Sequence, residues 1–226
     1  MEALSNLLQP YKHIVAKMAE TVTMLQMFSG VFMCWDIYKK KSTKGTDVMA
    51  FLIGLIIGVL QLNYGLVLKD PSMVQVNFFG LLLNIGYLSV FVKYERNPGP
   101  MWKKIGIACA ISVTVITYCQ LENPELVGHR FGLFMMAFMM FIIGQSLYGL
   151  KDVIKNKCTE GMPFPIILST TVVTFSWLLH SIAIKNQMLV IQNFLVCSLF
   201  AFQLSFFFIY PSRREESSES KDKKED

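Results

Sequence analysis

Long apolar blocks alternate with short polar segments along this chain, and this pattern predicts its structural class. Each block approaches the roughly 20 apolar residues that a helix needs to cross a bilayer. Barrel strands fit poorly, because the blocks lack the alternation of apolar and polar residues that such strands show. The pattern therefore predicts an all-α membrane protein with seven transmembrane helices: Met18–Ile37, Val48–Leu68, Val74–Val92, Ile105–Leu121, Phe131–Leu150, Pro163–Ile184 and Met188–Tyr210.

The composition agrees with a membrane protein. The 226 residues are 53% hydrophobic and only 16% charged, whereas about 25% of the residues of an ordinary soluble domain are charged. The segment before the first block has no sustained apolar core, so no cleavable signal peptide is expected. The five cysteines show no obvious pairing on an oxidising side of the membrane, so no structural disulfide is expected either.

The polar residues between the blocks recur in the same order, which indicates a duplicated three-helix unit. A basic turn ending in threonine follows the first helix of each copy, at Lys41-Ser42-Thr43 and at Lys157-Cys158-Thr159. An asparagine lies near the start of the third helix of each copy, at Asn77 and at Asn193. Two consecutive units of three helices would enter the membrane in opposite directions unless one further helix separated them.

The segment between the copies supplies that helix. Trp102–Leu121 has no counterpart in either copy, so it is expected to act as a linker that restores a parallel orientation. The cluster Asn97-Pro98-Gly99-Pro100 before it is expected to form a non-helical turn. The predicted architecture is 3+1+3, two parallel three-helix bundles joined by a linker helix: residues 1–100 for the first repeat, 101–126 for the linker, 127–211 for the second repeat and 212–226 for a disordered cytosolic tail.

The basic residues predict the orientation. Most of the 21 Lys and Arg residues lie in the tail or in the loops after the first, third and fifth helices. Positive charge in short loops favours the cytoplasmic side, so the N-terminus is expected outside or in a lumen and the C-terminus in the cytosol. The net charge of +5 is explained by this topology and indicates no nucleic-acid partner.

Two asparagines are the first candidates for a functional site. An amide inside a bilayer costs free energy unless it pairs, so Asn77 and Asn193 should face other helices or a wet cavity. Asparagine is also a favoured helix-capping residue, which leaves capping open as the alternative. Only Glu20 and Asp36, near the ends of the first helix, place a charge within the predicted spans. Ion-coupled transport usually needs acids inside the membrane, so passive uniport is the simpler prediction.

The duplicated motifs resemble the paired MtN3/saliva repeats of the SWEET sugar transporters, which are parallel repeats. The resemblance covers nearly the whole chain outside the tail. The residues that carry it are, in the first half, Phe28-Ser29-Gly30, Lys41-Ser42-Thr43, Tyr64-Gly65, Asn77 and Gly80, and, in the second half, Lys157-Cys158-Thr159-Glu160, Met162-Pro163-Phe164, Trp177, Asn193 and Tyr210-Pro211.

The resemblance implies a facilitative, bidirectional uniporter that carries mono- or disaccharides, such as glucose or a similar sugar, by alternating access. It implies a sugar site at mid-membrane formed by Asn77, Asn193, Trp177 and Gln61. The chemistry is suitable, because amides donate and accept hydrogen bonds as sugar hydroxyls do. Trp177 would offer an apolar face and an edge N–H. Gating or hinge roles are implied for Tyr64 and for the positions of a four-proline set, which here are Gly30, Ala50, Ser146 and Pro163.

The departures from the family pattern keep other functions open. Only Pro163 of the four prolines is retained, and His180-Ser181 replaces the second Tyr-Gly. The chain could therefore be a divergent paralog that acts as a sensor or scaffold, or a transporter of a non-sugar solute such as an amino acid. No catalytic motif indicates an enzyme, and no metal or other cofactor is expected. The sequence leaves open the sugar, the choice between plasma membrane and Golgi membrane, and whether the chain forms homo-oligomers within the bilayer.

Overall fold

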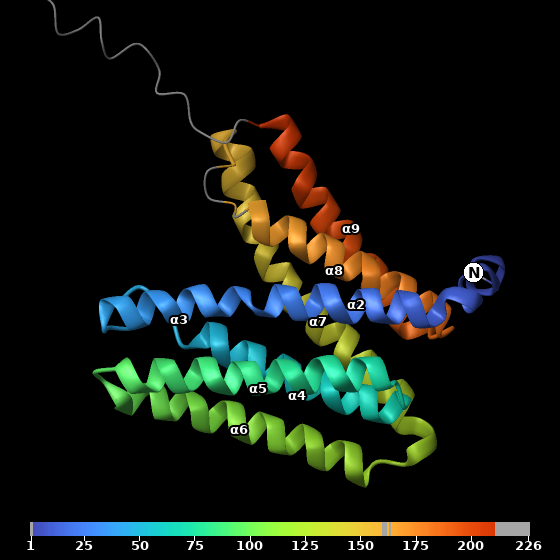
Figure 1. Cartoon of the computed structure of the whole chain (residues 1–226), viewed down its shortest axis with the longest axis horizontal. Coiled ribbons are helices and arrows are strands. Elements are labelled where there is room, and N and C mark those ends of the chain that lie inside the picture. Colours follow the sequence, from blue (N-terminus) through green and yellow to red (C-terminus); the bar gives the residue numbers. More distant parts are fainter. Residues whose placement is uncertain (1, 160–161, 163, 211–226) are drawn as a thin grey trace, which may run out of the picture.

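The computed structural model describes residues 2–159, 162 and 164–210, and these form an all-α protein (Figure 1). Six helices, α4 to α9, contain segments long and apolar enough to cross a membrane. The predicted tail, residues 212–226, and Pro163 lie outside the described residues. The elements are α1 (Glu2–Leu8), the 3-10 helix η1 (Gln9–Tyr11), α2 (Lys12–Met27), α3 (Ser29–Lys40), α4 (Met49–Leu68), α5 (Pro71–Tyr94), α6 (Pro98–Leu121), α7 (Pro124–Asn156), α8 (Phe164–Ala183) and α9 (Gln187–Ile209).

The first predicted helix is the one that differs most from expectation. Instead of one helix over Met18–Ile37, the structure has α2 and α3, which are separated at Phe28. The helical hydrogen-bond pattern tightens there, because the N–H of Val31 donates to the carbonyl of Phe28 at 3.0 Å. The segment before α2, for which no helix was predicted, is also helical, as α1 and η1.

The prediction of a non-helical turn at Asn97-Pro98-Gly99-Pro100 was wrong. Asn97 precedes the helix, but Pro98 is the first residue of α6, and Gly99 and Pro100 belong to its first turn. Proline is tolerated there because the first N–H groups of a helix have no partner within the helix. The linker helix is consequently as long as α5 instead of being the shortest.

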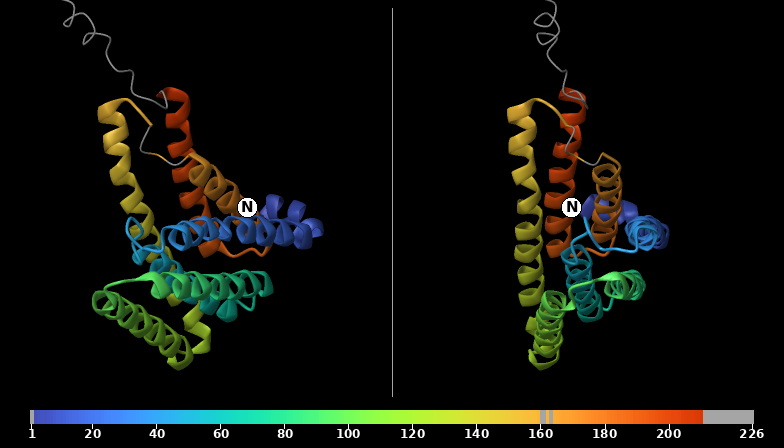
Figure 2. Two further views of the ribbon diagram at one scale, coloured as in Figure 1. Left: turned by 60° about the vertical axis from the view of Figure 1, so that its left-hand side comes forward. Right: turned by 90° about the vertical axis from the view of Figure 1, so that its left-hand side faces the viewer.

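The helices form two groups that diverge at one end. In the first group, α4 and α5 pack together and α2 and α3 pack on α5, while in the second α8 and α9 pack together and α7 packs on α9. The linker α6 packs on α4, and α2–α8 and α4–α7 contacts join the groups. Figures 1 and 2 show that the start of α8 and the end of α9 lie away from α3 and α5. We call the end at which α3, α5 and α7 finish the Lys-rich end, since Lys39, Lys93 and Lys155 lie in their last turns.

The hydrophobic core is divided in the same way. Among the described residues, each group has its own buried cluster at the Lys-rich end: one includes Ile37, Phe51 and Phe91, and the other includes Leu150 and Phe206. At the opposite end a single cluster joins both groups: Leu60, Tyr64, Met73, Val115, Val127, Phe131, Met135 and Leu189. The two groups are therefore packed together at the opposite end and apart at the Lys-rich end.

Candidate functional site

A cavity of about 280 Å³ lies between the two helix groups, and it brings the predicted site residues together. Gln61 comes from α4, Asn77 from α5, Trp177 from α8 and Asn193 from α9. The other residues that line the cavity are Thr23, Gln26, Met27, Ile57, Met73, Val76, Met139, Val173, Thr174, Leu189, Gln192 and Val196. All of these lining residues are uncharged, so the cavity is suited to a neutral solute.

The two asparagines are held in the same way. The amide of Asn77 donates to the carbonyl of Met73 at 2.8 Å, and that of Asn193 donates to the carbonyl of Leu189 at 2.9 Å. Each amide has a second N–H and an acceptor oxygen, so these bonds orient the side chains and leave hydrogen-bonding groups available for a ligand. The capping alternative does not apply, because α5 and α9 are capped by Asp70 and Asn186 instead.

The lining residues come in pairs that the repeat relates. The same sequence interval separates Asn77 from Asn193 and Gln61 from Trp177. It also relates Met73 to Leu189, Ile57 to Val173, Thr23 to Met139, and Val76 to Gln192. Thr23, Gln26 and Gln192 were not among the predicted site residues, and the interval could not have identified them, because it relates Thr23 and Gln192 to Met139 and Val76, which were not predicted either.

The indole of Trp177 is fixed by the opposite helix group. Its Nε1–H donates to the Thr23 hydroxyl at 2.8 Å, and that hydroxyl donates to the carbonyl of Ala19 at 2.6 Å. The expected free N–H at the edge of the indole is therefore engaged, and the aromatic face is what remains for a ligand. Next to it, the Gln26 amide donates to the Thr170 hydroxyl at 2.8 Å, a second polar contact between α2 and α8.

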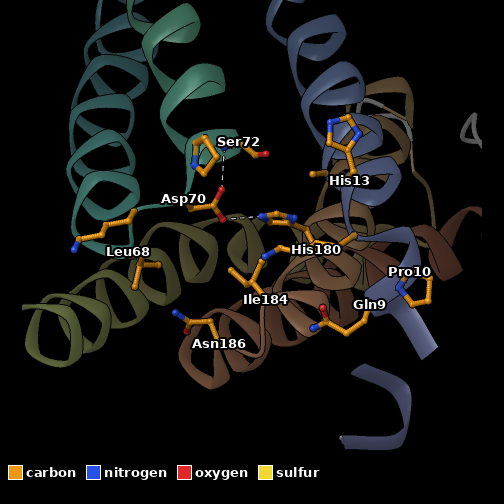
Figure 3. Close-up of a pocket in the computed structure, with 13 residues that line it drawn as sticks. Gln9, Pro10, His13, Leu68, Asp70, Ser72, His180, Ile184 and Asn186 are labelled. Atoms are coloured by element: carbon orange, nitrogen blue, oxygen red, sulfur yellow. Dashed lines mark hydrogen bonds and ion pairs between the residues drawn. The ribbon is translucent and has the colours of Figure 1, made fainter. Parts of the chain in front are cut away.

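A buried histidine–aspartate contact lies between the cavity and the end of the molecule opposite the Lys-rich end. His180 Nε2 of α8 is 2.7 Å from Asp70 Oδ2, and the two side chains are only 2% and 6% exposed (Figure 3). The other carboxylate oxygen of Asp70 accepts from the N–H groups of Ser72 and Met73. Burial raises the pKa of Asp70, but the contact with His180 and the two backbone bonds outweigh it and lower the pKa below its ordinary value. No role was predicted for His180 from the sequence, because its partner Asp70 is distant in the chain.

At the Lys-rich side the cavity adjoins a second cavity of about 310 Å³, which we call the vestibule. Thr23, Gln26 and Met27 line both the cavity and the vestibule, so the two spaces are neighbours. Two of the implied hinge positions, Gly30 and Ala50, line the vestibule. The remaining vestibule residues are Ser29, Met33, Phe51, Asn84 and Tyr87.

The other implied gating positions have different surroundings. Tyr64 is buried in the shared cluster at the opposite end. Ser146 lies within α7, but its side chain is outside the described part of the structure, as is Pro163. The site is therefore closed on the side of Tyr64, Asp70 and His180, and it adjoins a vestibule on the side of Gly30 and Ala50.

Sequence comparisons relate this chain to known transport proteins. Residues 13–99 and 129–215 match the MtN3/saliva family, described as "Sugar efflux transporter for intercellular exchange". The chain is 28% identical over 194 residues to the "Sugar transporter SWEET1" of Drosophila pseudoobscura pseudoobscura, covering 84% of this chain and 86% of that protein. It is 24% identical over 212 residues to the "Sugar transporter SWEET1" of Caenorhabditis elegans, covering 94% of this chain and 70% of the relative.

A plant relative and a solved structure extend the comparison. The "Bidirectional sugar transporter SWEET11" of Arabidopsis thaliana is 28% identical over 185 residues, which cover 78% of this chain and 63% of that longer protein. A solved structure of a eukaryotic SWEET transporter superposes with a TM-score of 0.78 at 23% identity, covering 89% of this chain and 97% of the other. This structural likeness supports the fold.

Proposed function

Because this chain belongs to the SWEET family of sugar transporters, we propose that it moves a small sugar, such as glucose, down its gradient in both directions. The observation that carries the proposal is the uncharged cavity in which Asn77, Asn193, Gln61 and Trp177 meet. Names of relatives that refer to sugar transport, and in one case to bidirectional transport, support the same activity. The proposal extends to the site: these four residues contact the sugar.

The lining chemistry suits a sugar. Amides from α5 and α9 match hydroxyls that both donate and accept, and the face of Trp177 suits the C–H surface of a sugar ring. Acids are absent from the lining residues, and intramembrane acids are the usual proton or ion sites of coupled transporters. Passive transport follows as the proposed mode.

For the transport cycle we propose movement of the two repeats, residues 1–100 and 127–211, about the linker 101–126. The described conformation has one end closed by the shared core cluster and the Asp70–His180 pair. The Lys-rich end has two separate clusters and a vestibule. Alternating access would require the shared cluster to separate while the clusters at the Lys-rich end approach each other.

The protein is a multi-pass membrane protein, and for its orientation we propose a cytosolic Lys-rich end and an extracellular or lumenal N-terminus. The positive charge of the Lys-rich loops supports this orientation. We propose the plasma membrane as its location, with the Golgi membrane as the alternative. The family description refers to intercellular exchange, which requires flux across the cell surface.

Counterflow of labelled glucose into proteoliposomes tests the activity and the site together. Saturable exchange that needs no ion gradient is expected for the wild type, and Asn77→Ala and Asn193→Ala should each reduce it at least ten-fold. The matched control is Asn63→Ala, because the Asn63 amide makes the same kind of bond, to the carbonyl of Val59 at 2.8 Å. Asn63 is not among the residues that line the cavity.

The outcomes of this experiment distinguish sugar transport from the alternative functions. Glucose exchange that is unaffected by Asn77→Ala and Asn193→Ala would refute the site but not the activity. A folded protein without flux for a panel of sugars would favour the sensor or scaffold, and exchange of an amino acid in its place would favour the non-sugar transporter. Equal losses in all three variants would indicate a folding defect, which thermal unfolding of each purified variant detects.

A further inference from the structure

A groove on the outside of the first helix group combines apolar, aromatic and basic residues. It has a volume of about 470 Å³ and lies between α3 and α5, near their Lys-rich ends. Val31, Cys34 and Val90 form its apolar part, and the other lining residues are Trp35, Tyr38, Lys93 and Tyr94. Val31, Cys34, Trp35 and Tyr38 are spaced three or four residues apart, so they share one face of α3. Gly30 and Met33, which line the vestibule, lie on a different face.

Aromatic rings and lysines gather at the Lys-rich end of the groove. The rings of Trp35 and Tyr38 stack at 5.8 Å, and Tyr94 meets Tyr38 edge-on at 6.3 Å. Lys41 Nζ lies 3.6 Å from the centre of the Tyr38 ring and 5.3 Å from that of Tyr94. Two more ammonium groups lie over this surface, since Lys39 is 5.3 Å from the Trp35 ring and Lys93 is 5.8 Å from the Tyr94 ring.

The carboxylates of the same segments are engaged elsewhere. Asp36 lies 3.9 Å from Lys40, and Glu95 accepts from the Thr43 hydroxyl at 2.7 Å and from the N–H of Asn97 at 2.9 Å. Among the described residues, no carboxylate forms an ion pair with Lys39, Lys41 or Lys93. These three ammonium groups contact aromatic rings, which neutralise none of their charge.

We infer that this groove binds an anionic phospholipid of the leaflet that the Lys-rich end reaches. The phosphate-bearing headgroup would lie among Lys39, Lys41 and Lys93, and an acyl chain would lie along Val31, Cys34 and Val90. Each part of the lipid then meets matching chemistry, since basic residues near an anionic leaflet attract its headgroups and tyrosine and tryptophan favour the interfacial region. Three ammonium groups at one place favour a headgroup with more than one phosphate, such as phosphatidylinositol 4-phosphate. The inference does not depend on the transport activity.

Native mass spectrometry of the purified protein tests the site. Phosphatidylinositol 4-phosphate, phosphatidylserine and phosphatidylcholine are added separately at equal concentration. One retained molecule of phosphatidylinositol 4-phosphate is expected for the wild type, with less phosphatidylserine and least phosphatidylcholine. The triple variant Lys39→Gln, Lys41→Gln, Lys93→Gln should lose at least ten-fold in the bound fraction.

A charge-matched control and a groove-filling variant make the result specific. Lys44→Gln, Lys155→Gln, Lys157→Gln removes the same number of exposed positive charges near the same end, and it should retain the lipid. Val90→Trp leaves all lysines in place but fills the apolar part of the groove, so it should also release the lipid. Equal losses in the two triple variants, or retention by Val90→Trp, would overturn the inference in favour of unspecific attraction to a basic surface. Equal retention of all three lipids by the wild type would overturn it as well.

Discussion

Asp70 makes two kinds of contact at the closed end of the molecule. Its carboxylate caps α5 through the N–H groups of Ser72 and Met73, and it pairs with His180 across the boundary between the helix groups. The substitution Asp70→Asn separates the two contacts, because asparagine is an equally good capping residue. The variant keeps the cap and loses the charge.

The first prediction concerns the stability of Asp70→Asn and its dependence on pH. A hydrogen bond to a charged partner is worth about 1–2 kcal/mol more than a neutral one, which corresponds to a fall in Tm of roughly 2–8 °C. Since the folded protein lowers the pKa of Asp70, the stabilisation is complete above the ordinary aspartate value of about 3.9 and is lost as the pH falls below it. The difference in Tm between wild type and variant should therefore shrink as the pH is lowered below about 4.

Asp47→Asn is the matched control for that measurement. Asp47 also accepts from a backbone N–H, that of Met49 at 3.0 Å, and also forms an ion pair, with Lys104 at 3.3 Å, but its side chain is exposed. Exposed ion pairs contribute about 0–1 kcal/mol, so this variant should remain close to the wild type. An Asp70→Asn variant as stable as the Asp47→Asn variant would show that the buried pair is not a stabilising contact.

The residues of the cavity were easier to predict than the contacts that hold them. Asn77 and Asn193 could be found because the duplication repeats them at equivalent positions, and Trp177 and Gln61 came with the family resemblance. By contrast, the Trp177–Thr23 and Asp70–His180 contacts join residues that are 154 and 110 positions apart in the chain. The two partners in each contact are different residue types. No local pattern in the sequence encodes such pairs, because the packing of α2 against α8 brings the first together and the contact of the α4–α5 turn with α8 brings the second together.

At the scale of elements, the break between α2 and α3 is the main departure from an ideal helix. Sharp kinks usually occur at proline or at a Gly/Ser pair, and Ser29-Gly30 is such a pair. The carbonyl of Met27 accepts from the Tyr87 hydroxyl of α5 at 3.1 Å. The ring of Tyr87 also packs on Gly30, where an added Cβ atom would lie 2.4 Å from it. Tyr87 thus satisfies a carbonyl at the break and occupies the space that a larger residue at position 30 would need.

The second prediction is that Tyr87→Phe slows transport without weakening substrate binding. The variant removes one hydroxyl and leaves the ring against Gly30, so the Met27 carbonyl loses its partner on α5 and the bend of the first helix is less well defined. We expect glucose counterflow to fall about three- to ten-fold, while the half-saturating glucose concentration changes less than two-fold. Tyr118→Phe is the control, because Tyr118 is exposed and its hydroxyl bonds Glu122, the residue after α6, at 3.1 Å. A similar slowing in the control, or none in Tyr87→Phe, would contradict a role for this hydroxyl.

The sequence predicted most helices, but it misplaced features that depend on helix ends and partners. The apolar blocks located the spans of α4 to α9, because burial in lipid demands long apolar helices, whereas the first block is divided between α2 and α3. The start of α6 at Pro98 was missed, because a proline cluster was interpreted as a stop although proline is favoured in a first turn. The break at Phe28 was missed because the group that stabilises it, Tyr87, lies on another helix.

At the scale of the whole molecule, the distribution of the core and of the charges defines two unlike ends. The shared cluster closes the end near Tyr64, whereas the vestibule at the Lys-rich end is lined by Ala50, which is exposed. If the Lys-rich end is cytosolic, a thiol at position 50 should be reachable only from the cytosol. A thiol at Glu125, in the exposed first turn of α7 at the other end, should be reachable only from outside.

The third prediction follows for thiol labelling in cells that express Ala50→Cys or Glu125→Cys with all five native cysteines replaced by serine. A membrane-impermeant maleimide should label Glu125→Cys in intact cells, and it should label Ala50→Cys only after the plasma membrane is permeabilised. The reverse pattern would mean that the orientation is inverted. A third outcome would assign the protein to the Golgi with its Lys-rich end in the cytosol. In that case neither variant is labelled in intact cells, and only Ala50→Cys is labelled after selective permeabilisation of the plasma membrane. Orientation and location are thus decided separately, because one depends on which thiol reacts and the other on whether intact cells expose any.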